Sequence, residues 1–139
     1  ATLGVHNLEL MDAIAARVLH AGAVAKYNPQ EVSITAWAFA TLGVTHTDLM
    51  DGIAARALQP GALDEFSPQA IANTVWAFAT LGVHNSDLMK GIAAQITQEG
   101  ILDKFRPQAI ANTLWAFAKL GEPSDALMTA MAGRIMQDG

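Results

Sequence analysis

The segment FSPQAIANTVWAFATLG at residues 66–82 decides the fold, because it returns as FRPQAIANTLWAFAKLG at residues 105–121 with 14 of 17 positions identical. The step is 39 residues, and YNPQEVSITAWAFATLG at residues 27–43 keeps the same frame without an insertion or deletion. Repetition at a fixed step of about 20 to 50 residues is typical of repeat arrays. We therefore predict repeats with approximate limits 1–39, 40–78 and 79–117, followed by a partial repeat at 118–139.

Each repeat is predicted to form a hairpin of two helices. In the second repeat the first helix covers residues 48–59, with Thr47 as its N-cap and Gly61 in the left-handed position that follows. The second helix covers residues 68–81, because a proline loses no hydrogen bond at the first helical position. Ser67 is its predicted N-cap.

The helix starts of the other repeats differ in quality. Asn28 and Glu31 have the spacing of a capping box, in which each side chain bonds to the other residue's backbone N–H. Arg106 stands at the capping position of the third repeat and is a poor cap.

The second helix of each repeat is apolar nearly all round, so it must be covered on several sides. Its own first helix covers one side, and neighbouring repeats must supply the rest. The fold class is therefore predicted to be all-α, an α-solenoid of about seven helices. Trp37, Trp76 and Trp115 are expected in the core between repeats, and the alternative is that they are platforms on which nucleic-acid bases stack. A methionine series is expected there as well: Met11, Met50, Met89 and Met128.

Both ends of the sequence resemble cut repeats. Residues 1–4 (ATLG) match the tail of a second helix, and the helix expected at residues 125–137 has no second helix after it. Natural arrays end in polar capping repeats, which we do not find. We expect this chain to be a fragment of a longer protein, without a targeting segment of its own.

Composition excludes several classes of protein. The chain is 52% hydrophobic and 15% charged, so it is too apolar to be intrinsically disordered. It contains no cysteine, which excludes disulfides, thiolate metal sites and a cysteine nucleophile. No apolar run approaches the roughly 20 residues that span a bilayer. No nucleophile motif or ligand pair is found, so we expect no enzyme, metal, cofactor or small-molecule substrate.

Polar residues inside the second helices are the first candidate binding surface. They share one helical face, and two of the three positions vary while the scaffold stays constant, as in proteins that read one RNA base per repeat. The alternative is that they hydrogen-bond within the stack. The candidates are Gln30 and Thr41, with Ile34 at the intervening position; Gln69, Asn73 and Thr80; and Gln108, Asn112 and Lys119.

A second candidate surface follows the first helix of each repeat. An ordinary solvated face is the alternative interpretation, and the sequence leaves open which surface is concave. Its members are Asp12, Arg17, Asp51, Arg56, Lys90 and Gln95.

The motif FxPQxIANTxWAFAxLG resembles the octotricopeptide repeat, and the array is similar to the helical repeats that precede RAP domains in organellar RNA-binding proteins. This resemblance implies an RNA-binding module in a chloroplast or mitochondrion. Single-stranded or ribosomal RNA would be the partner, in RNA stabilisation, processing, translation or a ribonucleoprotein particle. It implies no catalysis by the repeats.

Charge favours a different partner. The formal net charge is −5, from 8 basic and 13 acidic side chains, whereas phosphate contacts usually supply much of the affinity for RNA. The second hypothesis is therefore a protein–protein scaffold whose groove holds a peptide or helix. A basic stripe on the concave face would favour RNA, and an acidic or apolar groove would favour a protein.

Overall fold

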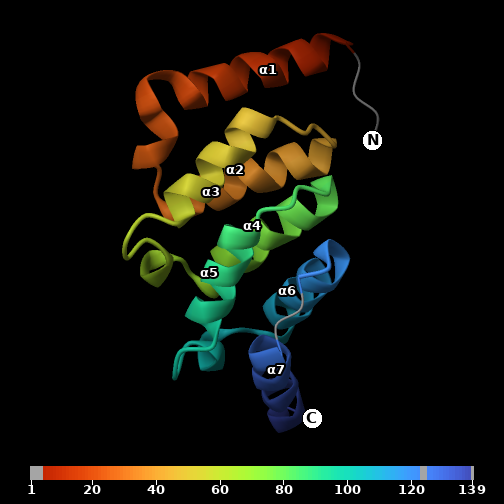
Figure 1. Cartoon of the computed structure of the whole chain (residues 1–139). Coiled ribbons are helices and arrows are strands. Elements are labelled where there is room, and N and C mark those ends of the chain that lie inside the picture. Colours follow the sequence, from red (N-terminus) through yellow and green to blue (C-terminus); the bar gives the residue numbers. More distant parts are fainter. Residues whose placement is uncertain (1–4, 123–124, 139) are drawn as a thin grey trace.

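The computed structural model is an array of helical hairpins (Figure 1). It describes residues 5–122 and 125–138. Within these ranges there are seven α-helices and no strand, so the predicted all-α solenoid is confirmed. The helices are α1 (Val5–Leu19), α2 (Pro29–Leu42), α3 (Thr47–Ala57), α4 (Pro68–Leu81), α5 (Ser86–Ile96), α6 (Pro107–Leu120) and α7 (Asp125–Asp138). Short 3-10 helices precede α2, α4 and α6, namely η1 (His20–Lys26), η2 (Leu63–Glu65) and η3 (Leu102–Lys104).

The even-numbered helices begin and end as the sequence predicts. The Ser67 side chain accepts a hydrogen bond from the backbone N–H of Ala70 at 3.1 Å. Asn28 and Glu31 form the capping box, and the Arg106 side chain makes no capping bond. Each of these helices ends at a left-handed glycine, such as Gly82 with φ of 68°. The alignment of proline and glycine signals therefore gives three helices of equal length.

Helix α3 begins one residue earlier than predicted. The N-cap of α3 is His46 instead of Thr47, because His46 Nδ1 accepts the hydrogen bond from the backbone N–H of Leu49 at 3.1 Å. Asn85 caps α5 at the equivalent position. Helix α3 ends at Ala57, before the predicted Gln59. The chain then turns through Gly61, which has a φ of 75°.

The helices form two layers (Figure 1). We call α1, α3, α5 and α7 the A layer, and α2, α4 and α6 the B layer. Neighbouring helices pack much more closely in the B layer than in the A layer. Alanines on the B helices allow this approach. The array therefore curves towards the B layer, which becomes its concave side.

Equivalent alanines show that each B helix is covered by its neighbours. Ala72 and Ala79 of α4 are 0% exposed, whereas Ala111 and Ala118 at the same positions of α6 are exposed. The difference arises because α6 covers this side of α4, while no B helix of the described chain follows α6. Burial therefore comes from the stack, as expected for a solenoid.

Small residues of the A layer also serve packing. A Cβ atom added at Gly52 would lie 3.1 Å from Leu19 Cδ2 and from Val24 Cγ1. At Gly91 it would lie 2.9 Å from Leu58 Cδ2. These glycines let α3 and α5 approach the preceding repeat.

The prediction that the tryptophans belong to the core is wrong for Trp37 and Trp115, whereas Trp76 packs against the core. Trp37 and Trp115 are 46% and 44% exposed, and Trp76 is half-buried. Their indoles lie on the outer side of the B helices, and phenylalanines such as Phe78, two residues further along, fill the interior instead. The methionine prediction is confirmed for three members, Met11, Met50 and Met89, and Met128 is half-buried.

Two other expectations concern the chain ends and membranes. The helix expected at residues 125–137 is α7, whereas the proposed helix tail at residues 1–4 lies outside the described residues. Among the described helices, none has the length and apolar character needed to cross a membrane.

Candidate nucleic-acid interface

The exposed surface of the B layer unites the predicted polar positions with the tryptophans. In each B helix a glutamine, the residue four positions on, the tryptophan seven on and the residue eleven on share one face, because an α-helix has 3.6 residues per turn. We call this surface the B face. It consists of Gln30, Ile34, Trp37 and Thr41; Gln69, Asn73, Trp76 and Thr80; and Gln108, Asn112, Trp115 and Lys119. Asn73, Trp76 and Asn112 are half-buried and the other nine are exposed.

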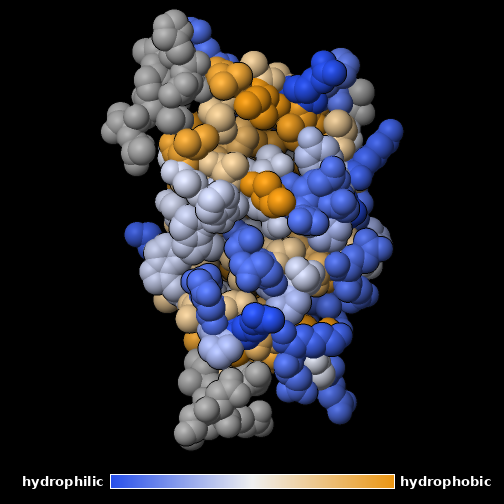
Figure 2. All heavy atoms as spheres, turned by 180° about the vertical axis from the view of Figure 1, so that it is seen from behind, coloured by the Kyte–Doolittle hydropathy of each residue, from blue (hydrophilic) through white to orange (hydrophobic). Residues whose placement is uncertain are grey.

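The three rows of the B face lie side by side. Because α2, α4 and α6 pack as neighbours and run in the same direction, equivalent residues form lines across the array. Packed helices are about 8–10 Å apart, so each line presents one side chain at that interval. Figure 2 views the molecule from behind, where this layer lies, and shows mixed hydrophilic and intermediate side chains over its middle.

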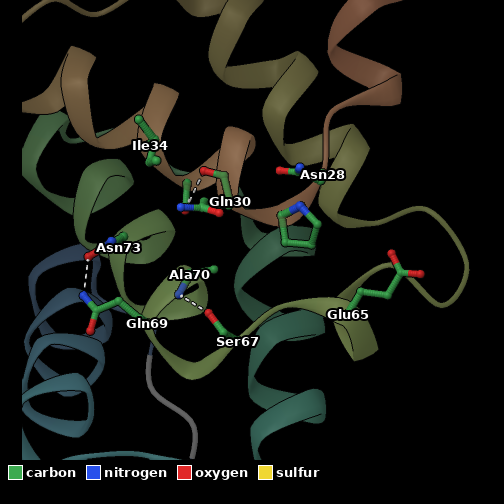
Figure 3. Close-up of a pocket in the computed structure, with 10 residues that line it drawn as sticks. Asn28, Gln30, Ile34, Glu65, Ser67, Gln69, Ala70 and Asn73 are labelled. Atoms are coloured by element: carbon green, nitrogen blue, oxygen red, sulfur yellow. Dashed lines mark hydrogen bonds between the residues drawn. The ribbon is translucent and has the colours of Figure 1, made fainter.

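A groove of about 550 Å³ separates the N-terminal halves of α2 and α4. Gln30 and Ile34 line it from α2, and Gln69 and Asn73 line it from α4 (Figure 3). Gln69 Nε2 donates a hydrogen bond to Asn73 Oδ1 at 2.9 Å, drawn as a dashed line in Figure 3. The first groove therefore joins side chains from two repeats.

A second groove, of about 300 Å³, lies between the N-terminal ends of α4 and α6. Ser67 and Gln69 line it on one side, and Lys104 and Arg106 line it on the other. Both cations are exposed. A groove with two cations beside a row of amides can hold the phosphate of a nucleic-acid backbone.

Charge divides the surface between its two grooves. The exposed Glu31 lies at the start of α2, and the exposed Glu65 lines the first groove. Lys104 and Arg106 line the second groove, and Lys119 belongs to the last row of the B face. The lining of the second groove therefore contains two cations and that of the first contains one carboxylate, although the whole chain is acidic.

The six residues of the second candidate surface do not share one environment in the structure. Asp12, Arg17, Asp51 and Lys90 are exposed on the A layer. Arg56 instead donates from Nε to the backbone oxygen of Tyr27 at 2.6 Å, which ties α3 to the segment before α2. Gln95, at the equivalent position of α5, is 7% exposed. Two of the six residues thus serve packing between hairpins.

For the tryptophans the sequence favoured the core over base stacking, and it did not place the η3 cations beside the amides. The spacing of seven from Gln30 to Trp37 was a sufficient signal, because it puts both residues on one helical face. Lys104 and Arg106 carried no such signal, since their position beside Gln69 depends on how two repeats stack. Within the described ranges no cluster of three or more His, Asp or Glu side chains is arranged to hold a metal ion.

Comparison with known proteins agrees with an RNA-associated helical protein. Residues 1–138 match the model of the RNA-editing substrate-binding complex 6 protein family. The chain belongs to this family. No curated protein matches the chain. The membership supports RNA association and the helical fold, whereas the narrower octotricopeptide resemblance stays a prediction.

Proposed function

We propose that this chain binds single-stranded RNA on its B face and works as a non-catalytic module of a larger ribonucleoprotein. The repeats hold the RNA, and other components perform the chemistry on it. Membership of a family named for the substrate-binding complex of RNA editing supports this role.

The observation that carries the proposal is the alternation of amides and tryptophans on three parallel helices. Exposed Trp37 and Trp115 and half-buried Trp76 offer flat surfaces for bases, and base–aromatic stacking contributes about 1–3 kcal/mol per base. Three exposed large apolar side chains, Ile34, Trp37 and Trp115, lie on this one face. Single-stranded RNA has the unstacked bases that such a surface needs.

The mitochondrion is the proposed location. The family is that of a mitochondrial RNA-editing complex, which agrees with an organellar protein and does not support the chloroplast. We propose an octotricopeptide-like manner of binding, in which one hairpin serves one nucleotide. Stabilisation or presentation of transcripts for editing is the role that we propose within the complex.

A protein–protein scaffold is the second candidate function. Leu10 and Ile14 of α1 are 57% and 40% exposed. Exposed apolar patches on otherwise polar surfaces often mark protein interfaces. Such an interface on α1 would dock the module without competing for the B face.

The test is RNA binding by fluorescence anisotropy with the chain, the double variant Trp37→Ala/Trp115→Ala and a matched A-layer variant, Asp51→Ala/Lys90→Ala. We expect the chain to bind single-stranded RNA, the tryptophan variant to lose at least tenfold in affinity and the A-layer variant to bind normally. Circular dichroism and thermal unfolding would confirm that both variants fold. Equal RNA binding by the two variants would contradict the proposal, and binding lost only in the A-layer variant would move the interface to that layer.

A further inference from the structure

The position occupied by Ile34, Asn73 and Asn112 varies on an otherwise repeated surface. The glutamine four residues earlier and the tryptophan three residues later are the same in all three B helices. Ile34 and Asn73 both line the first groove, so the apolar and the amide versions face the same space. Figure 3 shows them on the two helices that bound this groove.

The Gln69–Asn73 hydrogen bond fixes the orientation of the amide in α4. Because Gln69 Nε2 donates to Asn73 Oδ1, Asn73 Nδ2 and Gln69 Oε1 are left as a neighbouring donor and acceptor. A base edge presents donors and acceptors at similar spacing, and a bidentate amide–base contact is a common means of discrimination. An oriented amide reads a base better than a freely rotating one, since less conformational entropy is lost on binding.

The repeat that contains α2 has no such pair of hydrogen-bonded amides. Ile34 is 53% exposed and has no hydrogen-bonding group, although Gln30 precedes it as Gln69 precedes Asn73. It offers a base only apolar contact beside Trp37. Apolar contact of this kind is tolerant of sequence, because every base has an apolar face.

We propose that the residue at position 34, 73 or 112 determines base specificity in its repeat, so that α4 and α6 each select a base and α2 accepts any base. Gln69 is a positioning residue for Asn73. This inference rests on the proposed function, and it adds which repeats read sequence and which residue reads it.

Selection from a randomised single-stranded RNA pool, followed by sequencing, tests the proposal. We expect the chain to enrich two adjacent informative positions, each with about a five- to a hundredfold preference for one base. Asn73→Ile should erase one of them while affinity for the unselected pool falls less than about threefold. This substitution installs the residue that α2 already carries at the same helical position.

The reciprocal variant provides gain of function. Ile34→Asn should add a third informative position next to the existing pair, and Gln69→Ala should broaden the preference at the position lost in Asn73→Ile. Lys90→Ala, on the A layer, is the matched control and should leave the selected sequence unchanged.

The outcomes separate this inference from the proposed function. Unchanged enrichment in both Asn73→Ile and Ile34→Asn, with normal affinity for the pool, would overturn the specificity proposal and leave RNA binding intact. Absence of binding to the pool by the folded chain would overturn both.

Discussion

The two grooves of the B face are built from the same repeat and differ in charge. The groove between α2 and α4 is lined by Glu65 and Ile34, whereas the groove between α4 and α6 is lined by Lys104 and Arg106. The backbone frame and the glutamine row are shared, so the contrast depends on a few exchangeable side chains. The array therefore keeps its scaffold constant and varies the charge of the side chains that line each groove.

The difference also suggests how RNA is arranged on the surface. Phosphate groups favour the cations near α6, and the acidic side chains near α2 disfavour them. The α6 end should supply most of the affinity, and the α2 end should contribute stacking without strong phosphate contacts.

The largest expected effect comes from single tryptophan substitutions. Trp115→Ala should lower the affinity for single-stranded RNA about ten- to a hundredfold, since a base stack contributes about 1–3 kcal/mol. Trp37→Ala should lower it less, because RNA is held more weakly beside the acidic groove. Anisotropy titrations at one salt concentration would measure both. A larger loss for Trp37→Ala would reverse the proposed order of the grooves.

Removal of the two cations should have the next largest effect. Lys104→Ala/Arg106→Ala is expected to weaken RNA binding about tenfold at low salt and to reduce the slope of log K against log salt by about 1.4, or about 0.7 per lost contact. Affinity measured across a series of salt concentrations gives this slope. Arg17→Ala/Lys90→Ala, which removes two exposed cations from the A layer, is the control. A slope identical in both variants would mean that phosphates do not contact η3 and the start of α6.

The helices that bound the two grooves also differ in their N-caps, because α2 and α4 have capping side chains and α6 has none. Arg106→Ser should provide α6 with the cap that Ser67 gives to α4, raising the free energy of unfolding by about 1 kcal/mol. Asn28→Ala should lower the free energy of unfolding by a similar amount, because it removes the capping box of α2. Denaturant unfolding would measure the free energy of unfolding of both variants, which should rise for Arg106→Ser and fall for Asn28→Ala. An unchanged midpoint for Arg106→Ser would mean that the end of α6 is already satisfied.

The smallest expected effect belongs to the acidic groove. Glu65→Gln removes a negative charge from the lining and should tighten RNA binding about two- to threefold at low salt, with the gain fading as salt screens it. Asp64→Asn is the matched control, because Asp64 is a neighbouring exposed carboxylate that does not line the groove. Equal gains from both substitutions would indicate a general effect of net charge instead of a contact in the groove.

The repeat frame was predictable because local rules decide it. Pro68 starts α4 because it loses no hydrogen bond at the first helical position, and Gly82 ends this helix because a left-handed φ of 68° costs glycine little. His46 was missed as a cap because histidine is a less common acceptor at that position than threonine, and only the bond to Leu49 identifies it. The shared face of Gln69 and Asn73 also followed from spacing alone.

The sequence by itself determined the helices, their period and the need to stack, because hydrogen bonding and burial within a repeat depend on near neighbours in the chain. Only the tertiary structure decided which surface is concave, that Trp37 and Trp115 face solvent, and that Lys104 and Arg106 lie across from Gln69. Those features depend on the distance and angle between packed hairpins, which the side chains of two repeats set together. The candidate RNA surface therefore belongs to the stack, and no single repeat contains it.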